Sequence, residues 1–185
     1  MKKTIHITHG AMTIALTGII LFADRITLGL FMPFLALPLI IYGAYYSVSE
    51  ALVVGFSNVL LSIILSGMIP TVVTMIGYVF VGLAYIYCFH ENKTKGQFYI
   101  YMSLAMSILY FIMIIFFGEY FGISINETIA TIHQYMPFLT LRFVQVAALF
   151  TVFLTMLMEV FIVKVSADIV LMMLTKAGHR PMKNS

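Results

Sequence analysis

The chain alternates long apolar runs with short polar interruptions. An apolar run of about 20 residues is long enough to cross the hydrocarbon core of a bilayer as a helix. Six apolar runs occur, at residues 9–23, 27–46, 51–66, 71–89, 97–117 and from residue 138 onward, and the first is short unless its polar flank is included. The pattern predicts an all-α integral membrane protein, in which residues 1–185 form a single membrane domain with a bundle of six transmembrane helices.

Proline, glycine and serine residues indicate where these helices bend and end. Pro33 and Pro38 lie inside the second run. Because proline removes a backbone donor, this segment is predicted to be bent or broken. Ser47 or Ser49 can cap the following helix, and the glycine and proline within residues 67–70 predict a very short turn.

The last apolar run is too long for one perpendicular crossing. No glycine or proline interrupts residues 140–176, which as one helix would measure about 55 Å against about 30 Å of hydrocarbon. We expect the crossing to end between Glu159 and Asp168, with residues 169–176 continuing in or along the cytoplasmic interface. Residues 118–137 carry no Lys or Arg and are expected to form an outer loop, long enough for a lid or a short surface helix.

Composition supports membrane insertion. Hydrophobic residues make up 62% of the sequence and charged residues 9%, which excludes an ordinary soluble domain. The net charge of +3 does not indicate nucleic-acid binding, because the positive residues flank apolar runs and are expected to meet anionic lipid headgroups.

The distribution of Lys and Arg predicts the orientation. Short loops rich in these residues stay in the cytoplasm. Of the ten Lys and Arg, eight lie on one predicted side: Lys2, Lys3, Lys93, Lys95, Lys164, Lys176, Arg180 and Lys183. Both termini are therefore predicted to be cytoplasmic, and only Arg25 and Arg142 fall on the opposite side.

Polar residues in the predicted outer half are candidates for solute binding. Arg142 lies about one turn inside the sixth span, with Gln145 on the same helical face. An arginine in hydrocarbon costs at least a few kcal/mol. Arg142 therefore either extends its guanidinium to the lipid headgroups or pairs with Glu119. The third alternative is that it forms two parallel hydrogen bonds to a carboxylate or phosphate of a solute. Polar residues on neighbouring helices either form hydrogen bonds that hold the helices together or, with Arg142 and Gln145, line an outward-opening cavity. The predicted substrate-binding residues are Arg142, Gln145, Glu119, Tyr110, Thr74 and Tyr78.

Motifs for catalysis are absent from the sequence. There is no HExxH, GxSxG or P-loop motif and no Cys/His spacing for a metal, so no enzyme activity, cofactor or metal site is predicted. Glu159, Lys164 and Asp168 are expected to form a charged inner patch, with Lys164 and Asp168 paired at i,i+4. No acidic residue is expected near the middle of the membrane, which argues against a proton-coupled carrier.

The first helix carries the small-residue step Ala11-x-x-x-Ala15, followed by Gly18. Small residues on one face allow another helix to approach closely. With the chain length, six spans, inner termini and the proline-bearing second helix, this motif resembles the S components of energy-coupling factor (ECF) vitamin transporters. The resemblance implies a multi-pass protein of a prokaryotic plasma membrane. Its Ala11, Ala15 and Gly18 face would meet a membrane T component that couples to two cytoplasmic ATPases.

The resemblance also implies that a water-soluble vitamin or precursor binds near the outer side. Arg142 favours a carboxylate-bearing solute such as pantothenate. A site that uses the tyrosines and not the positive charge of Arg142 would suit an aromatic ring, such as pyridoxine or a pyrimidine precursor. The alternative from another class is a non-transporting membrane scaffold or assembly subunit, in which small-residue faces serve only helix packing.

Overall fold

The fold is taken from a computed structural model. The structure describes residues 2–27, 29–118, 130–131, 134–135, 141–179 and 181. Regular structure in this part of the chain is helical throughout. The elements are α1 (Lys2–Ile26), the 3₁₀-helix η1 (Met32–Ala36), α2 (Leu37–Tyr45), α3 (Val48–Ser66), α4 (Ile69–His90), α5 (Lys95–Phe117) and α7 (Leu141–Lys176).

Five of these helices, α1, α3, α4, α5 and α7, are long and apolar enough to span a membrane. The predicted second span is shorter, covering Met32–Tyr45 as η1 followed by α2. The described chain thus has five candidate spans and one shorter helical segment where the sequence predicted six spans. The predicted break is confirmed: Pro33 and Pro38 each lie in the first turn of a new helical piece, where the missing N–H is not needed.

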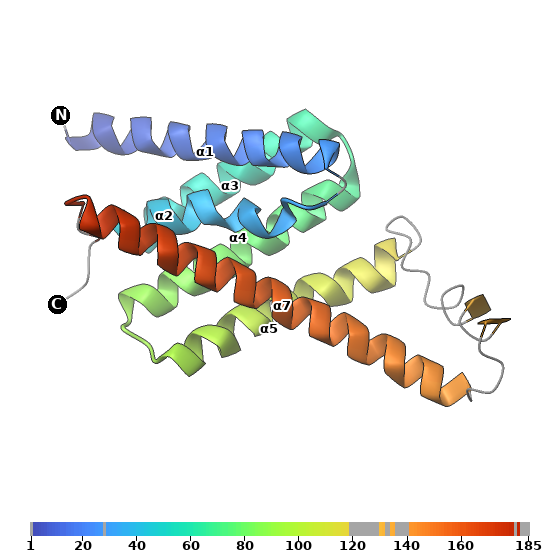
Figure 1. Ribbon diagram of the computed structural model, residues 1–185. Coiled ribbons are helices and arrows are strands. Elements are labelled where there is room, and N and C mark those ends of the chain that lie inside the picture. The colour runs from blue at the N-terminus through green and yellow to red at the C-terminus, as the bar shows by residue number, and fades with distance from the viewer. Residues whose placement is uncertain are drawn as a thin grey trace.

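The shorter segment lies inside the bundle. In Figure 1, α2 runs between α1 and α7 and over α4, and it packs against all three helices and against α3. Leu35, Ala36, Leu39, Ile40 and Ala44 are buried. A helix that contacts protein on every side does not have to match the thickness of the hydrocarbon core, so this short segment can connect the two ends of the bundle.

Both described chain ends lie at one end of the bundle, which we call the N/C end (Figure 1). The turns at residues 46–47 and 91–94 also lie there, and the Tyr45 hydroxyl donates to the His179 carbonyl at 3.1 Å. Arg25, in the last turn of α1, and Arg142, in the first turn of α7, belong to the opposite end, the far end. Lys95, at the start of α5, and Lys176, in the last turn of α7, lie toward the N/C end. Arg180 and Lys183 lie outside the described residues, and the side of the membrane that each end faces remains a prediction.

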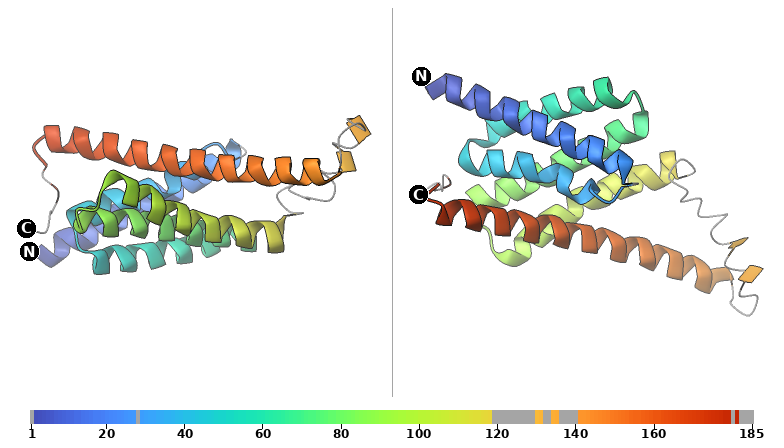
Figure 2. Two further views of the ribbon diagram at one scale, coloured as in Figure 1. Left: turned by 90° about the horizontal axis from the view of Figure 1, so that it is seen from below. Right: turned by 45° about the horizontal axis from the view of Figure 1, so that its top comes forward.

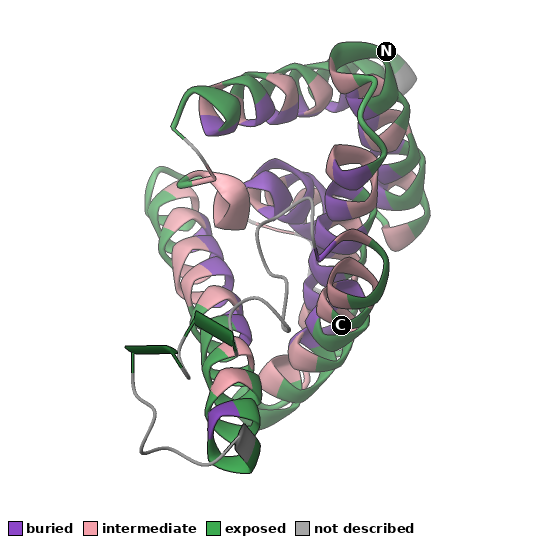
Figure 3. Cartoon of the chain, turned by 90° about the vertical axis from the view of Figure 1, so that its right-hand side faces the viewer, coloured by how far each residue is buried: buried purple, intermediate pink, exposed green. Residues whose placement is uncertain are grey.

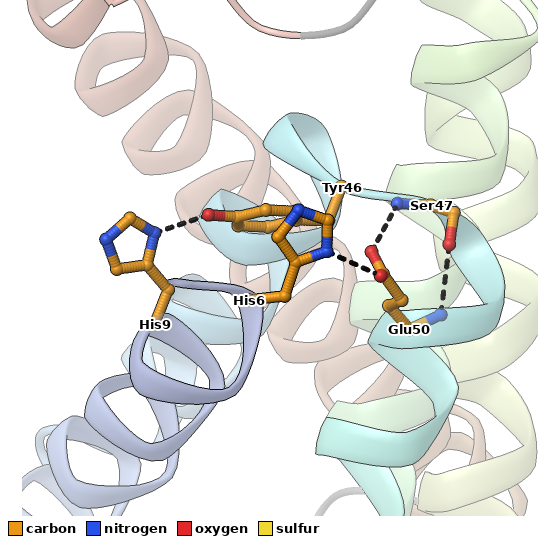
Figure 4. Close-up of polar contacts among 5 residues, drawn as sticks. All are labelled: His6, His9, Tyr46, Ser47 and Glu50. Atoms are coloured by element: carbon orange, nitrogen blue, oxygen red, sulfur yellow. Dashed lines mark hydrogen bonds and ion pairs between the residues drawn. The ribbon is translucent and has the colours of Figure 1, made fainter. Parts of the chain in front are cut away.

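Helices α1 and α3 both start at the N/C end, where polar contacts join α1 to the start of α3 (Figure 4). His6 Nδ1 lies 2.8 Å from Glu50 Oε1, and His9 hydrogen-bonds the Tyr46 hydroxyl. Burial and the nearby Glu50 charge raise the pKa of Tyr46, so its hydroxyl remains a donor. The Glu50 N–H donates to Ser47 Oγ at 3.2 Å, and the Ser47 N–H donates to Glu50 Oε2 at 3.3 Å. This capping box confirms Ser47 as the cap of α3.

Helix α7 is continuous over 36 residues, or about 54 Å, and runs along one side of the bundle (Figure 2). Its residues from Arg142 to Thr155 are mostly exposed. Arg142 and Lys164 are separated by about 33 Å along the helix axis, which is close to the thickness of a hydrocarbon core. The helix continues beyond Lys164 to Lys176. The membrane boundary expected between Glu159 and Asp168 therefore falls within one unbroken helix.

The outer surface of the bundle is apolar. Buried faces point inward and exposed faces point outward in Figure 3. Large side chains such as Phe22, Ile64, Phe111 and Phe153 are exposed. Contiguous exposed apolar surface of this extent is solvated by lipid in membrane proteins.

Close helix packing generates the first prediction. A Cβ added at Gly43 would lie 2.3 Å from Ile86 Cδ1, and Ile86 is fully buried. We expect Gly43→Ala to lower the free energy of unfolding by about 1–3 kcal/mol, because the core must shift to accept the methyl group. Thermal unfolding in detergent measures the loss. Gly96→Ala, where a Cβ meets nothing within 4 Å, is the control, and equal stability of the two variants would contradict the packing.

Candidate solute-binding site

Two tyrosines of α4 hydrogen-bond two carboxylates of α7. The Tyr78 hydroxyl donates to Glu159 Oε2 at 3.0 Å. Two turns further along α4, the Tyr85 hydroxyl donates to Asp168 Oδ1 at 2.6 Å. Tyr110 of α5 lines the same cavity as Glu159. Away from water, a carboxylate requires such partners, because unpaired burial is costly.

A cavity separates α4 from α7 around Glu159. The backbone of α7 lies closest to α5, α2 and η1, whereas α4 reaches it through the length of tyrosine side chains. Helices held apart in this way leave space between them. The resulting cavity has a volume of about 220 Å³ and is lined by Met32, Thr74, Tyr78, Leu109, Tyr110, Met113, Ile114 and Glu159.

The cavity extends from the middle of the bundle toward the far end. Tyr78 is near the middle of α4, and Thr74 is one turn closer to the far end. Glu159 therefore lies near the middle of the bundle. This corrects the expectation that Glu159 belongs to an inner patch with Lys164 and Asp168, and that no acidic residue lies at this depth. The pairing of Lys164 with Asp168 is itself confirmed, at 2.5 Å.

The described lining is rich in acceptors and has no positive charge. Glu159 supplies a carboxylate, and the tyrosine rings and the Met32 and Met113 side chains supply polarisable walls. The Thr74 hydroxyl donates to the Pro70 carbonyl at 2.9 Å, so its proton is already used. Such a lining attracts cations or neutral groups with several N–H or O–H donors.

The structure brings together three of the six predicted substrate-binding residues. Thr74, Tyr78 and Tyr110 line the cavity. Arg142 and Gln145 are exposed in the first turns of α7, and Arg142 is about 25 Å from Glu159 along the helix axis. They do not line the cavity. Glu119 lies outside the described residues.

Sequence reasoning missed Glu159 as a member of the site. The sequence does contain an indication that Glu159 lies deep in the bundle. Residues 143–158 contain no charge, and Glu159 is the first charged residue after them. Its neighbours in the cavity, Tyr78 and Tyr110, are on helices far away in sequence. In the described part of the chain, no group of three or more His, Cys, Asp or Glu could hold a metal ion.

The small-residue face of α1 is accessible over part of its length. Ala11 and Ala15 are exposed. A Cβ added at Gly18 would lie 3.1 Å from Leu61 Cδ2, so Gly18 serves close packing of α1 on α3. Ala15 and Gly18 border a shallow apolar groove between these helices, together with Phe22 and three aliphatic residues. The groove leaves the Ala11 and Ala15 positions open to another helix.

The helices define a multi-pass helical membrane protein, and a half-open cavity lies between four of its helical elements. The chain belongs to a family of predicted membrane proteins, DUF2232, which matches residues 11–141. That region includes the walls that η1, α4 and α5 contribute to the cavity, and it ends before Glu159. No curated protein and no solved structure matches the chain.

The hydrogen bond from Tyr78 to Glu159 generates the second prediction. Tyr78→Phe leaves the half-buried Glu159 carboxylate with one fewer donor and should reduce the free energy of unfolding by about 1–3 kcal/mol. The same change at Tyr101, which is 40% exposed, should have no measurable effect. Thermal denaturation in one detergent compares the two variants. If Tyr78→Phe is as stable as Tyr101→Phe, the bond to Glu159 does not contribute to folding.

Proposed function

We propose that the protein is the solute-capture subunit, or S component, of an ECF-type transporter in a prokaryotic plasma membrane. The observation that carries the proposal is the half-open cavity beside Glu159, which offers a site for a small water-soluble molecule in an otherwise apolar bundle. If the lysine-rich N/C end is cytoplasmic, the cavity lies in the middle and outer half of the membrane. A solute from outside would enter there.

The charge of the cavity distinguishes between the candidate solutes. Pantothenate carries a carboxylate, which Glu159 would repel, and Arg142 is too far away to compensate. A ring with N–H and O–H donors, such as pyridoxine or an aminopyrimidine precursor, can donate to Glu159 and stack against Tyr78 or Tyr110. A cavity of about 220 Å³ is also small for a ligand site, which favours a single ring over an extended chain.

The energy for uptake would come from other subunits. The chain has no ATP-binding motif, so two cytoplasmic ATPases, reached through a membrane T component, would supply it. The exposed Ala11 and Ala15 positions on α1 support a docking surface for that component. They allow close helix approach without disturbing the cavity, which lies between other helices.

A non-transporting scaffold is the second candidate function. The observation that favours it is the hydrogen bond from the Tyr78 hydroxyl to Glu159, an arrangement that can be purely structural. In that case the cavity would hold no solute.

Ligand binding gives the third prediction. Pyridoxine or an aminopyrimidine should raise the unfolding temperature of the purified protein in a thermal-shift screen of water-soluble vitamins. Glu159→Gln should weaken that binding about tenfold or more, because a charge-assisted hydrogen bond is lost. Arg142→Ala should bind like the original protein. Stabilisation by pantothenate that depends on Arg142 would contradict this site, and the absence of any stabilising solute would favour the scaffold.

Partner docking gives the fourth prediction. Ala15→Trp adds bulk to an exposed position and should abolish copurification with a T component and ATPases, while solute binding is retained. Leu16→Trp is the matched control, because Leu16 is 49% exposed on a different face of the same helix. Retention of the complex by Ala15→Trp, or equal loss in both variants, would eliminate the α1 face as the docking surface.

A further inference from the structure

A second polar region lies near the N/C end, on the same helix as Glu159 but separate from its cavity. Lys164 is buried, with 6% of its surface exposed. Its ammonium group contacts Asp168 Oδ2 at 2.5 Å and lies 5.5 and 5.3 Å from the ring centroids of Phe98 and Tyr99. Burial of an ammonium group requires such pairing.

An open groove adjoins this lysine. It has a volume of about 540 Å³, and its lining includes Lys95, Phe98, Lys164, Asp168, Leu171 and Met172. Both oxygens of Asp168 are engaged, one by Lys164 and the other by the Tyr85 hydroxyl. In the described lining, two ammonium groups face one carboxylate, and Lys95 forms no ion pair with any described residue. The groove therefore has an excess positive charge.

The remaining walls are apolar. Leu171 and Met172 follow Asp168 along α7, and Phe98 faces them from α5. Lys95 lies in the first turn of α5, next to the polar turn at residues 91–94. A site with cations at a bundle end and aliphatic walls matches an amphiphile that has an anionic head and an apolar tail. Basic pockets between transmembrane helices bind anionic lipid headgroups in this way.

We propose that the groove binds an anionic phospholipid, with its phosphate between Lys95 and Lys164 and an acyl chain along Leu171 and Met172. Lys164 is fixed by Asp168 and the aromatic rings, so its position is set before the lipid arrives. Lys95 supplies the charge that Asp168 does not neutralise. A free phosphate ion would satisfy the two lysines but would leave the apolar walls without a partner.

The experiment uses the absence of tryptophan from the chain. Met172→Trp places a single fluorophore at an exposed position of the groove. The labelled protein is reconstituted in bilayers that contain brominated phosphatidylglycerol or brominated phosphatidylcholine, and quenching gives the relative affinity for the two lipids. We expect a preference for phosphatidylglycerol.

Lys95→Gln in this background should lower the preference about fivefold, because one lysine near the headgroups is removed. Lys93→Gln is the matched control, since Lys93 lies over the Tyr87 ring and does not line the groove. Inorganic phosphate, compared with chloride at equal ionic strength, should not change the quenching. Equal quenching by both lipids, equal effects of the two lysine variants, or displacement by inorganic phosphate would each overturn the proposal.

Discussion

The tyrosine–carboxylate hydrogen bonds between α4 and α7 are the constraint that organises this bundle. Glu159, partly buried between apolar helices, needs a donor to its carboxylate, and the more exposed Asp168 is held in the same way. Tyr78 and Tyr85 provide those donors at 3.0 and 2.6 Å. A tyrosine places its hydroxyl far from its own backbone, so the same bonds that fix α7 also keep it away from α4. The Glu159 cavity and the lysine groove both border α7 as a consequence.

The two carboxylates have similar tyrosine partners but different electrostatic surroundings. Asp168 is paired with Lys164, and Lys95 borders the same groove. Glu159 has no cation among its described neighbours. One helix thus lines an acceptor-rich chamber near the middle of the bundle and a cation-rich groove near the N/C end. This difference explains why we assign a donor-bearing solute to the first and an anionic headgroup to the second.

Local rules predicted most of the helices, whereas the site depends on contacts between distant residues. The Ser47 cap and the break at Pro33 and Pro38 follow from chemistry within one turn, and they were predicted correctly. The short η1–α2 segment was not, because a length rule derived from lipid contact fails for a buried helix. Glu159 was misplaced for a similar reason. Its donor Tyr78 and its cavity neighbour Tyr110 lie 81 and 49 residues away in sequence, and helix periodicity does not indicate which faces meet.

A half-buried carboxylate is a costly way to hold two helices together. Replacement of buried polar pairs by well-packed apolar residues is often neutral or stabilising, so packing alone would be served by a leucine or methionine at residue 159. The existing arrangement has a property that an apolar contact lacks. The Glu159 carboxylate has more acceptor positions than the Tyr78 hydroxyl uses. An N–H or O–H of a solute can therefore donate to the carboxylate while the tyrosine hydrogen bond is kept, which is the physical basis for treating Glu159 as a binding residue.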